Sequence, residues 1–358
     1  MKSFIYMIIF LVLFQIGLPL IYPSAHVIGY RVDYQTVRDN LYMYDAVLEQ
    51  IRKEVRAHPE KEVVILLGDS VAYSGPVSSD ESIGYYLKSM TENEEEPPLI
   101  YNLALPSFQA GDIYTMLLKL EEYGIPREHV AINVRYAGFT RRDPGAAIVF
   151  WLKDELRRLD PRAFERSLPQ LVATGYRPPE TALEKIQDFF VNRVYPRIAM
   201  YRYKEFVKQD ILRFVPGNPE KSDTLGDPRP WYEKPKLPEL LKQRQYTDAM
   251  RDEPFDMTES SLQIYFLEKI IDLQRGKQTL FFLTGVNTEL MERYVTKPGY
   301  QANLKSIDAY FAGKPVQYVN LHGRIPNDLF TDHTHFTSEG YRQIADAVWK
   351  LMSKGGNR

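Results

Sequence analysis

The pattern of apolar and polar positions predicts buried strands that alternate with amphipathic helices. The clearest strand is Val63–Leu67, where five consecutive apolar residues fit a strand covered on both faces. Similar runs, each a candidate strand, lie at 99–104, 129–134, 279–283 and 316–318. Because the first three are separated by helical patterns, the chain is predicted to be an α/β protein with a parallel sheet and right-handed crossovers.

The segments between these runs carry apolar residues at helical spacing. Helices are predicted at 30–60, 82–90, 112–123, 257–273 and 339–352. The first of them would link an N-terminal segment to the first strand. Its apolar and aromatic stripe is typical of packing against a core.

The N-terminus contains a long uncharged segment. Residues 4–22 include no charged side chain and one strongly polar one, Gln15, and as a helix they would extend about 28 Å, close to the hydrocarbon thickness of a bilayer. Lys2 precedes the segment and favours a cytoplasmic N-terminus. We therefore expect a single-pass anchor in the cell membrane at 1–25 and an extracytoplasmic remainder. Cleavage by signal peptidase near 23–25 is the alternative.

Composition narrows the possible functions. The chain has no cysteine, which excludes disulfides and thiol chemistry, and its net charge of −2 gives no basic face for nucleic acid. Asp332, His333 and His335 are close in sequence, but no further Cys/His cluster accompanies them, so neither a metal nor another cofactor is predicted.

The alternation of strands and helices is interrupted at 140–256. This part is rich in Pro, Arg, Tyr and Phe and is predicted to be a helical insertion or cap, which divides an α/β domain into 26–139 and 257–358. Within it, 182–214 is basic, aromatic and amphipathic, and Pro196 must break or kink it. Such a helix can lie on a membrane surface or pack as a cap on the main domain.

Three side chains suggest nucleophilic catalysis. Ser70 follows the strand at 63–67 directly, at the strand end where α/β sheets bind ligands. Asp332 and His335 lie close together near the C-terminus and would supply a base and its orienting anion. Taken singly, Ser70 also fits a helix N-cap and His335 a surface histidine.

The Gly68-Asp69-Ser70 turn and the Asp332-x-x-His335 pair resemble the first and last motif blocks of the SGNH (GDSL-like) hydrolase family. The resemblance covers about 60–140 and 278–350. It implies that Ser70 is the nucleophile, His335 the general base and Asp332 its orienting carboxylate, without a cofactor.

The resemblance also implies an oxyanion hole built from a second-block glycine and a third-block asparagine. Here the second block has Ser107 with Gly111 nearby, and the third reads Asn133-Val134-Arg135-Tyr136, so both depart from the family pattern. The hole would then use the backbone N–H of Ser70 and one from the 104–107 loop. Arg135 would add a charge or serve as a structural ion-pair partner.

Asn287 follows another predicted strand end and would shape the site or form an ordinary turn. An anchored SGNH-like domain resembles envelope proteins that add or remove acyl groups. The expected function is serine-dependent O-acyl transfer or ester hydrolysis on a cell-envelope polysaccharide or other polymer. The expected partners are an acyl donor, that polymer and a membrane acyltransferase. The alternatives are a non-catalytic module that binds glycan or a protein partner, and a lipid esterase facing the bilayer.

Overall fold

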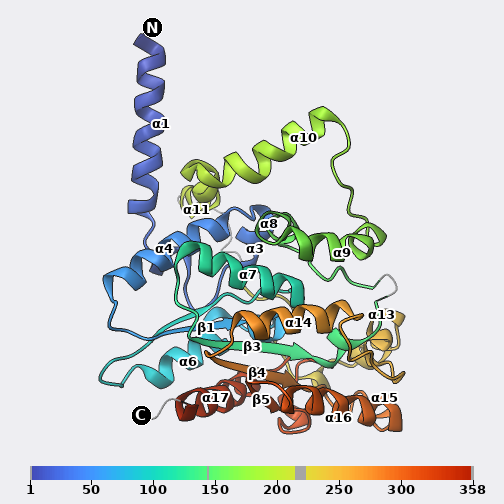
Figure 1. The fold of residues 1–358 in the computed structure, drawn as a ribbon. Helices are drawn as coiled ribbons and strands as arrows, with labels where there is room; N and C mark the ends of the chain where they lie inside the picture. Colours follow the sequence, from blue (N-terminus) through green and yellow to red (C-terminus); the bar gives the residue numbers. More distant parts are fainter. Residues whose placement is uncertain (1, 143–144, 214–222, 356–358) are drawn as a thin grey trace.

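A five-stranded parallel sheet forms the centre of the protein, which we describe from a computed structural model covering residues 2–142, 145–213 and 223–355 (Figure 1). The strands are β1 Val63–Leu67, β2 Leu99–Asn102, β3 His129–Arg135, β4 Gln278–Thr284 and β5 Gln317–Asn320. Their order in the sheet is β2-β1-β3-β4-β5, and every pair is parallel. The predicted α/β class and parallel sheet are confirmed.

The strand order reverses between β1 and β3. From β1 the chain moves outward to β2, then returns to β3 on the other side of β1 and continues to β4 and β5. The loops that leave β1 and β3 therefore run in opposite directions and open a crevice at their carboxyl ends. In open α/β sheets such a switch point is where ligands bind. Ser70 and Arg135 both lie at this edge.

Helices cover both faces of the sheet (Figure 1). One face carries α4 Met43–Ala57, α7 Ala110–Tyr123 and α14 Leu262–Leu273, and the other carries α6 Ile83–Thr91 and α17 Ser338–Gly355. Successive side chains of β1 enter the two cores alternately, as the pleat of a strand requires. All five residues of β1 are buried, which explains why its sequence shows a continuous apolar run.

The segment between β3 and β4 contains helices and, among its described residues, no strand. Its helices are α8 Lys153–Leu159, α9 Pro161–Ala173, α10 Ala182–Phe189, α11 Ala199–Arg213, α12 Leu237–Leu240 and α13 Arg244–Thr247. A π-helical turn, Phe190–Val194, and a 3-10 turn, Tyr195–Arg197, separate α10 from α11. The break falls at Pro196, as predicted, because proline lacks the N–H that continues a helix.

Some predicted boundaries differ from the structure. The single helix expected at 30–60 is two helices, α3 Tyr34–Asp39 and α4, separated at Asn40, whose backbone is extended and whose side chain donates to the carbonyl oxygen of Tyr201. Helix α14 begins at Leu262, later than the expected 257. The pattern analysis also missed α16 Pro298–Ala312, although its buried residues recur at helical spacing. The remaining short helices are α2 Ser24–Val27, α5 Ser70–Tyr73 and α15 Glu292–Val295.

Helix α1, Lys2–Ile21, projects away from the body of the protein (Figure 1). Its mean hydropathy is 2.5, and it is long and apolar enough to cross a membrane by length and composition, a test that signal sequences also pass. Its C-terminal end is integrated into the fold. Leu18 is buried, the carbonyl oxygen of Pro19 accepts from Gln50 at 2.7 Å, and the ring of Tyr22 stacks on Tyr203.

Candidate active site

The turn after β1 presents Ser70 at the switch point of the sheet. Gly68 has φ +152°, and a Cβ there would come within 2.6 Å of the Cβ of Asn133, so the turn is too tight for another residue. Asp69 caps helix α5, because its Oδ1 accepts the N–H of Val71 at 2.9 Å. The capping role considered for Ser70 is thus filled by Asp69, and the Ser70 hydroxyl is free for another partner.

That partner is His335. Its Nε2 lies 2.9 Å from Ser70 Oγ, and its Nδ1 lies 2.8 Å from Asp332 Oδ2. Since an ionised carboxylate only accepts hydrogen bonds, Nδ1 carries the proton and Nε2 is left to accept from the serine hydroxyl. The structure therefore brings the three residues predicted from sequence into one hydrogen-bonded chain, although 265 positions separate Ser70 from His335.

The loop that carries His335 is organised around Asp332. Asp332 Oδ1 accepts the backbone N–H groups of Thr334 and His335, each at 2.8 Å, while Oδ2 faces the imidazole. Burial of Asp332 acts to raise its pKa. The charge and hydrogen bonds of His335, with smaller contributions from His333 and the Thr334 N–H, outweigh burial and hold that pKa well below its usual range. The carboxylate consequently stays ionised beside the imidazole.

His333 has a different environment from His335. Burial, together with smaller contributions from His335 and Arg135, lowers the pKa of His333 to about 4 against the opposing effect of Asp332. Its ring meets Tyr246 edge to face, with centroids 5.2 Å apart. His333 is therefore a neutral packing residue at physiological pH.

Asn287 contacts the loop that carries His335. It is fully buried at the end of β4, its backbone N–H donates to the carbonyl oxygen of His333 at 3.0 Å, and its amide donates to that of Asn327 at 3.1 Å. Its Oδ1 accepts the N–H groups of Glu289 and Leu290, which forms a turn. Both roles considered for Asn287 are present: it forms a turn, and through that turn it positions the loop of His335.

Arg135 forms an ion pair through its Nε with Asp69, the residue before Ser70. The carboxylate of Asp69 is buried, and its second oxygen is engaged by the N–H of Val71. Arg135 Nε is buried and, within the described part of the chain, its contact with Asp69 is an ion pair without hydrogen-bond geometry. The ion-pair role is thus present, and it holds a guanidinium group beside Ser70.

Ser107 occupies a backbone conformation that glycine usually fills. Its φ is +71°, and it lies in a turn closed by the N–H of Phe108 donating to the carbonyl oxygen of Leu105 at 3.0 Å. Left-handed φ values are unusual for residues with a Cβ. The backbone at this position is therefore left-handed, although the residue is a serine and not a glycine.

The backbone amides of residues 104–107 differ in availability. Ala104 donates to a side-chain oxygen of β2 at 3.0 Å, and Leu105 donates to the carbonyl oxygen of Gly68 at 3.1 Å. Pro106 has no N–H. Among these four residues, all of which the structure describes, Ser107 alone has an N–H without a protein acceptor. If this loop supplies one N–H to an oxyanion hole, as expected, that donor is the N–H of Ser107.

Gly111 serves packing. It lies in the first turn of α7, where its N–H donates to the carbonyl oxygen of Ile148 at 3.1 Å. A Cβ on Gly111 would come within 2.3 Å of Val149 Cγ2. The close approach of segment 148–149 explains the glycine, and its N–H is not available for an oxyanion.

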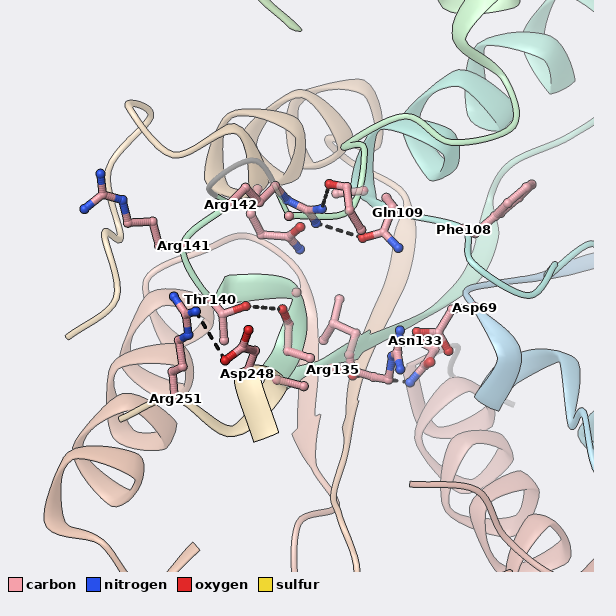
Figure 2. A pocket seen from close by; sticks show the side chains of 18 of the residues that line it. Asp69, Phe108, Gln109, Asn133, Arg135, Thr140, Arg141, Arg142, Asp248 and Arg251 are labelled. Atoms are coloured by element: carbon pink, nitrogen blue, oxygen red, sulfur yellow. Dashed lines mark hydrogen bonds and ion pairs between the residues drawn. The ribbon is translucent and has the colours of Figure 1, made fainter. Parts of the chain in front are cut away.

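A cavity of about 490 Å³ opens beside Asp69 and Arg135 (Figure 2). Sequence reasoning missed most of its polar residues, which include Arg142, Arg251 and Gln263. They come from segments far apart in the chain, two of them from the part interpreted as an insertion. No local motif connects them, so no sequence signal could have grouped them.

Comparisons with known proteins give little further information. No family model matches the chain, and no curated protein matches it. Thirteen chains of solved structures do match. One is a lipase, Lip_vut3, from a goat rumen metagenome, with 10% identity and a TM-score of 0.36 over 81% of this chain and 97% of the lipase. That likeness is too distant to support an argument. The fold and site themselves define an α/β protein with a Ser–His–Asp chain at the switch point of its sheet.

Proposed function

We propose that the protein transfers acyl groups through a covalent acyl-enzyme on Ser70. The observation that carries the proposal is the continuous hydrogen-bonded chain from Ser70 through His335 to Asp332, with distances of 2.9 Å and 2.8 Å. Serine is a weak nucleophile at neutral pH and needs an adjacent base that is oriented by a third group. Each of these groups is present at a sheet edge suited to ligand binding.

In the proposed reaction, the Ser70 hydroxyl passes its proton to His335 Nε2 while Oγ attacks the carbonyl carbon of an ester or thioester. The tetrahedral intermediate expels the alcohol or thiol, which takes the proton from Nε2, and the acyl group remains on Oγ. An acceptor hydroxyl then gives its proton to Nε2 and attacks the acyl-serine, which restores Ser70. Asp332 stays ionised throughout and stabilises the imidazolium.

The developing oxyanion requires preorganised donors. The candidates are the N–H of Ser70 and the N–H of Ser107, which no protein acceptor engages within the described residues. The guanidinium of Arg135, fixed by Asp69, adds positive charge near Ser70. This set replaces the third-block asparagine of the SGNH hydrolases that the motifs resemble.

The acceptor decides between two outcomes of the same chemistry. Water gives an esterase, and a sugar hydroxyl gives an O-acyltransferase. We favour transfer to or from a cell-envelope glycan or polymer outside the cytoplasm, supported by the layout of the N-terminus. A membrane acyltransferase that supplies acyl groups fits this placement as a partner.

The contacts of α1 support an anchor that stays attached. Gln15, the polar residue in the apolar segment, donates to the carbonyl oxygen of Arg197 at 3.0 Å and accepts the N–H of Ala199 at 2.7 Å. Tyr22 is buried against Tyr203 and Phe206 of α11. Cleavage after residue 25 would remove these contacts and expose part of the core.

The apolar side of α10 supports a membrane-facing orientation. Leu183, Ile186 and Phe189 have exposed fractions of 75%, 57% and 56%, and Phe190 in the next turn is also exposed. Helix α10 lies on the same side of the protein as α1 (Figure 1). Because α11 is tied to Gln15 of α1, we propose that α10 lies in the membrane interface, where its apolar side leaves water.

A fluorophosphonate probe tests the catalytic proposal. It should label Ser70 in the full-length wild type in detergent, and it should not label Ser70→Ala or His335→Ala of the same thermal stability. Mass spectrometry after incubation with acetyl and longer-chain ester donors should then identify the acyl group on Ser70. A folded wild type that is neither labelled nor acylated would favour the non-catalytic binding module, which the departures from the family's oxyanion blocks keep as the alternative.

A further inference from the structure

The cavity beside the candidate active site is built from separated parts of the fold. It is lined by the residue before the nucleophile, the N-terminal part of α7, the end of β3 with the segment after it, residues of 245–251, and α14. Its volume of about 490 Å³ is within the range of about 300–1,000 Å³ that small-molecule sites occupy. Ser70 and His335 are not among its lining residues, but Asp69, which is, directly precedes Ser70 in the chain.

The cavity is cationic in an acidic protein. Four arginines line it, Arg135, Arg141, Arg142 and Arg251, together with two described carboxylates, Asp69 and Asp248. The described lining residues thus carry four positive and two negative charges, a sum of +2, whereas the whole chain carries −2. Low-dielectric walls strengthen such a field and concentrate anions. In Figure 2, Arg141 points away from the space that the other three arginines surround.

Arg142 is held by neutral groups, and the nearby buried carboxylate of Asp112 acts to raise its pKa against the effect of burial. It donates to the carbonyl oxygen of Ala146 and, at 2.8 Å, to Gln109 Oε1, both neutral acceptors. Its Nε is buried without a hydrogen-bond partner, and no carboxylate pairs with it among the residues that the structure describes. Burial lowers the pKa of Arg142 to about 10, which leaves it charged at neutral pH. A partly buried guanidinium held by neutral groups favours an anionic ligand.

The remaining polar lining consists of neutral hydrogen-bonding groups. They are the amides and hydroxyl of Gln109, Asn133, Thr140, Gln245 and Gln263. Asn133 is 3% exposed, and its Oδ1 has no hydrogen-bond partner in the described chain. Side chains that both donate and accept are suited to a ligand with many hydroxyl groups.

We infer that this cavity binds an anionic, hydroxyl-rich unit of the polymer that Ser70 acylates or deacylates, with Arg142 and Arg251 recognising its carboxylate or phosphate. Arg251 Nη2 lies 3.3 Å from Asp248 Oδ1, and both residues line the cavity. The inference rests on the proposed function for the identity of the unit as a substrate. The expected ligand is therefore an acidic sugar or a polyol phosphate, and a neutral glycan should bind weakly.

Binding can be measured without turnover, using full-length Ser70→Ala protein in detergent and isothermal titration at constant ionic strength. Trigalacturonate supplies carboxylates, tri(glycerol phosphate) supplies phosphates, and maltotriose is the neutral match. At least one anionic probe should bind about tenfold more tightly than maltotriose, and the tighter of the two identifies the source of the anion.

Two substitutions in the cavity and one outside it complete the test. On the Ser70→Ala background, Arg142→Gln and Arg251→Gln should each lower the affinity for the anionic probe by about tenfold. Arg275→Gln, which removes an exposed arginine elsewhere, should leave that affinity unchanged. Melting temperatures identify any variant that misfolds. If Arg142→Gln misfolds, Arg251→Gln still tests the inference, because the Arg251 side chain donates no hydrogen bond to the backbone of the described residues.

Equal affinity for maltotriose, or anionic binding that persists in Arg251→Gln, would overturn the inference. Fluorophosphonate labelling of the wild type does not depend on this cavity's ligand. If the probe labels the wild type but neither anionic ligand binds, the proposed acyl-transfer chemistry stands and only the inferred substrate class is wrong.

Discussion

Replacing Asp332 with asparagine should nearly abolish acyl transfer without unfolding the protein. In the wild type, Asp332 Oδ1 accepts two backbone N–H groups and Oδ2 accepts His335 Nδ1–H. An asparagine oxygen can replace Oδ1 at the two N–H groups, which directs the new amide NH₂ at Nδ1. The imidazole must then accept at Nδ1 and carry its proton on Nε2, where it can no longer accept the proton of Ser70.

The size of the effect follows from the lost tautomer. Ser70 Oγ lies 2.9 Å from His335 Nε2, so the proton can pass directly between them. Among the described residues, no second base is hydrogen-bonded to Ser70 Oγ. In serine proteases the same replacement lowers kcat by about 10⁴-fold. At about 1.36 kcal/mol for each tenfold change, this is about 5.4 kcal/mol of transition-state stabilisation. The melting temperature should change little, because both backbone bonds remain.

The assay is the burst and steady state of p-nitrophenyl acetate hydrolysis by full-length wild type and Asp332→Asn, with labelling rates by a fluorophosphonate as a second readout. Both rates should fall together. A variant that retains kcat/KM within tenfold of the wild type would refute the reasoning. Another carboxylate would then have to orient His335, and Asp328, the candidate that the sequence offers, would be tested next.

Three further results are expected. Asp112 accepts four backbone N–H groups at 2.8–3.0 Å, so Asp112→Ala should lower the free energy of unfolding in urea by about 4 kcal/mol, at about 1 kcal/mol for each unpaired group. The pKa of His333 is about 4 in the folded protein, against about 6.5 for an ordinary histidine. The folded state is therefore fully favoured by neutral His333 above pH 6.5, and about 3 kcal/mol of the free energy of unfolding should be lost as pH falls towards 4, a loss absent in His333→Gln. A nitroxide on Ile186→Cys, the sole cysteine, should be more accessible to oxygen than to a nickel complex in proteoliposomes. A nitroxide on Arg275→Cys should show the reverse, and equal behaviour would contradict the membrane-facing orientation of α10.

Local patterns predicted the parts of the fold whose stability depends on neighbours in sequence. The apolar run of β1 reflects burial on both faces, and Pro196 ends a helix whatever surrounds it. The break at Asn40 was missed because it depends on a contact with Tyr201, 161 positions away. A helical pattern alone carries no information about such a contact.

The candidate site shows the same division. Asp332 and His335 are three residues apart, so their pairing is a property of one loop and could be predicted from the motif. The ion pair of Asp69 with Arg135 could not, because it depends on β1 and β3 being neighbours in the sheet. The left-handed backbone of Ser107 was also hidden, since serine carries no signal for that conformation.

The sequence by itself determined the strand and helix types, the position of Ser70 at a strand end, and the acid–base pair near the C-terminus. These follow from side-chain periodicity and from spacings of a few residues. The tertiary structure alone decided that Ser70 Oγ meets His335 Nε2, that Ser107 offers a vacant N–H, and that arginines from separate segments surround one cavity. The physical reason is that strand order and crossover direction select which distant side chains converge, and no local period encodes that choice.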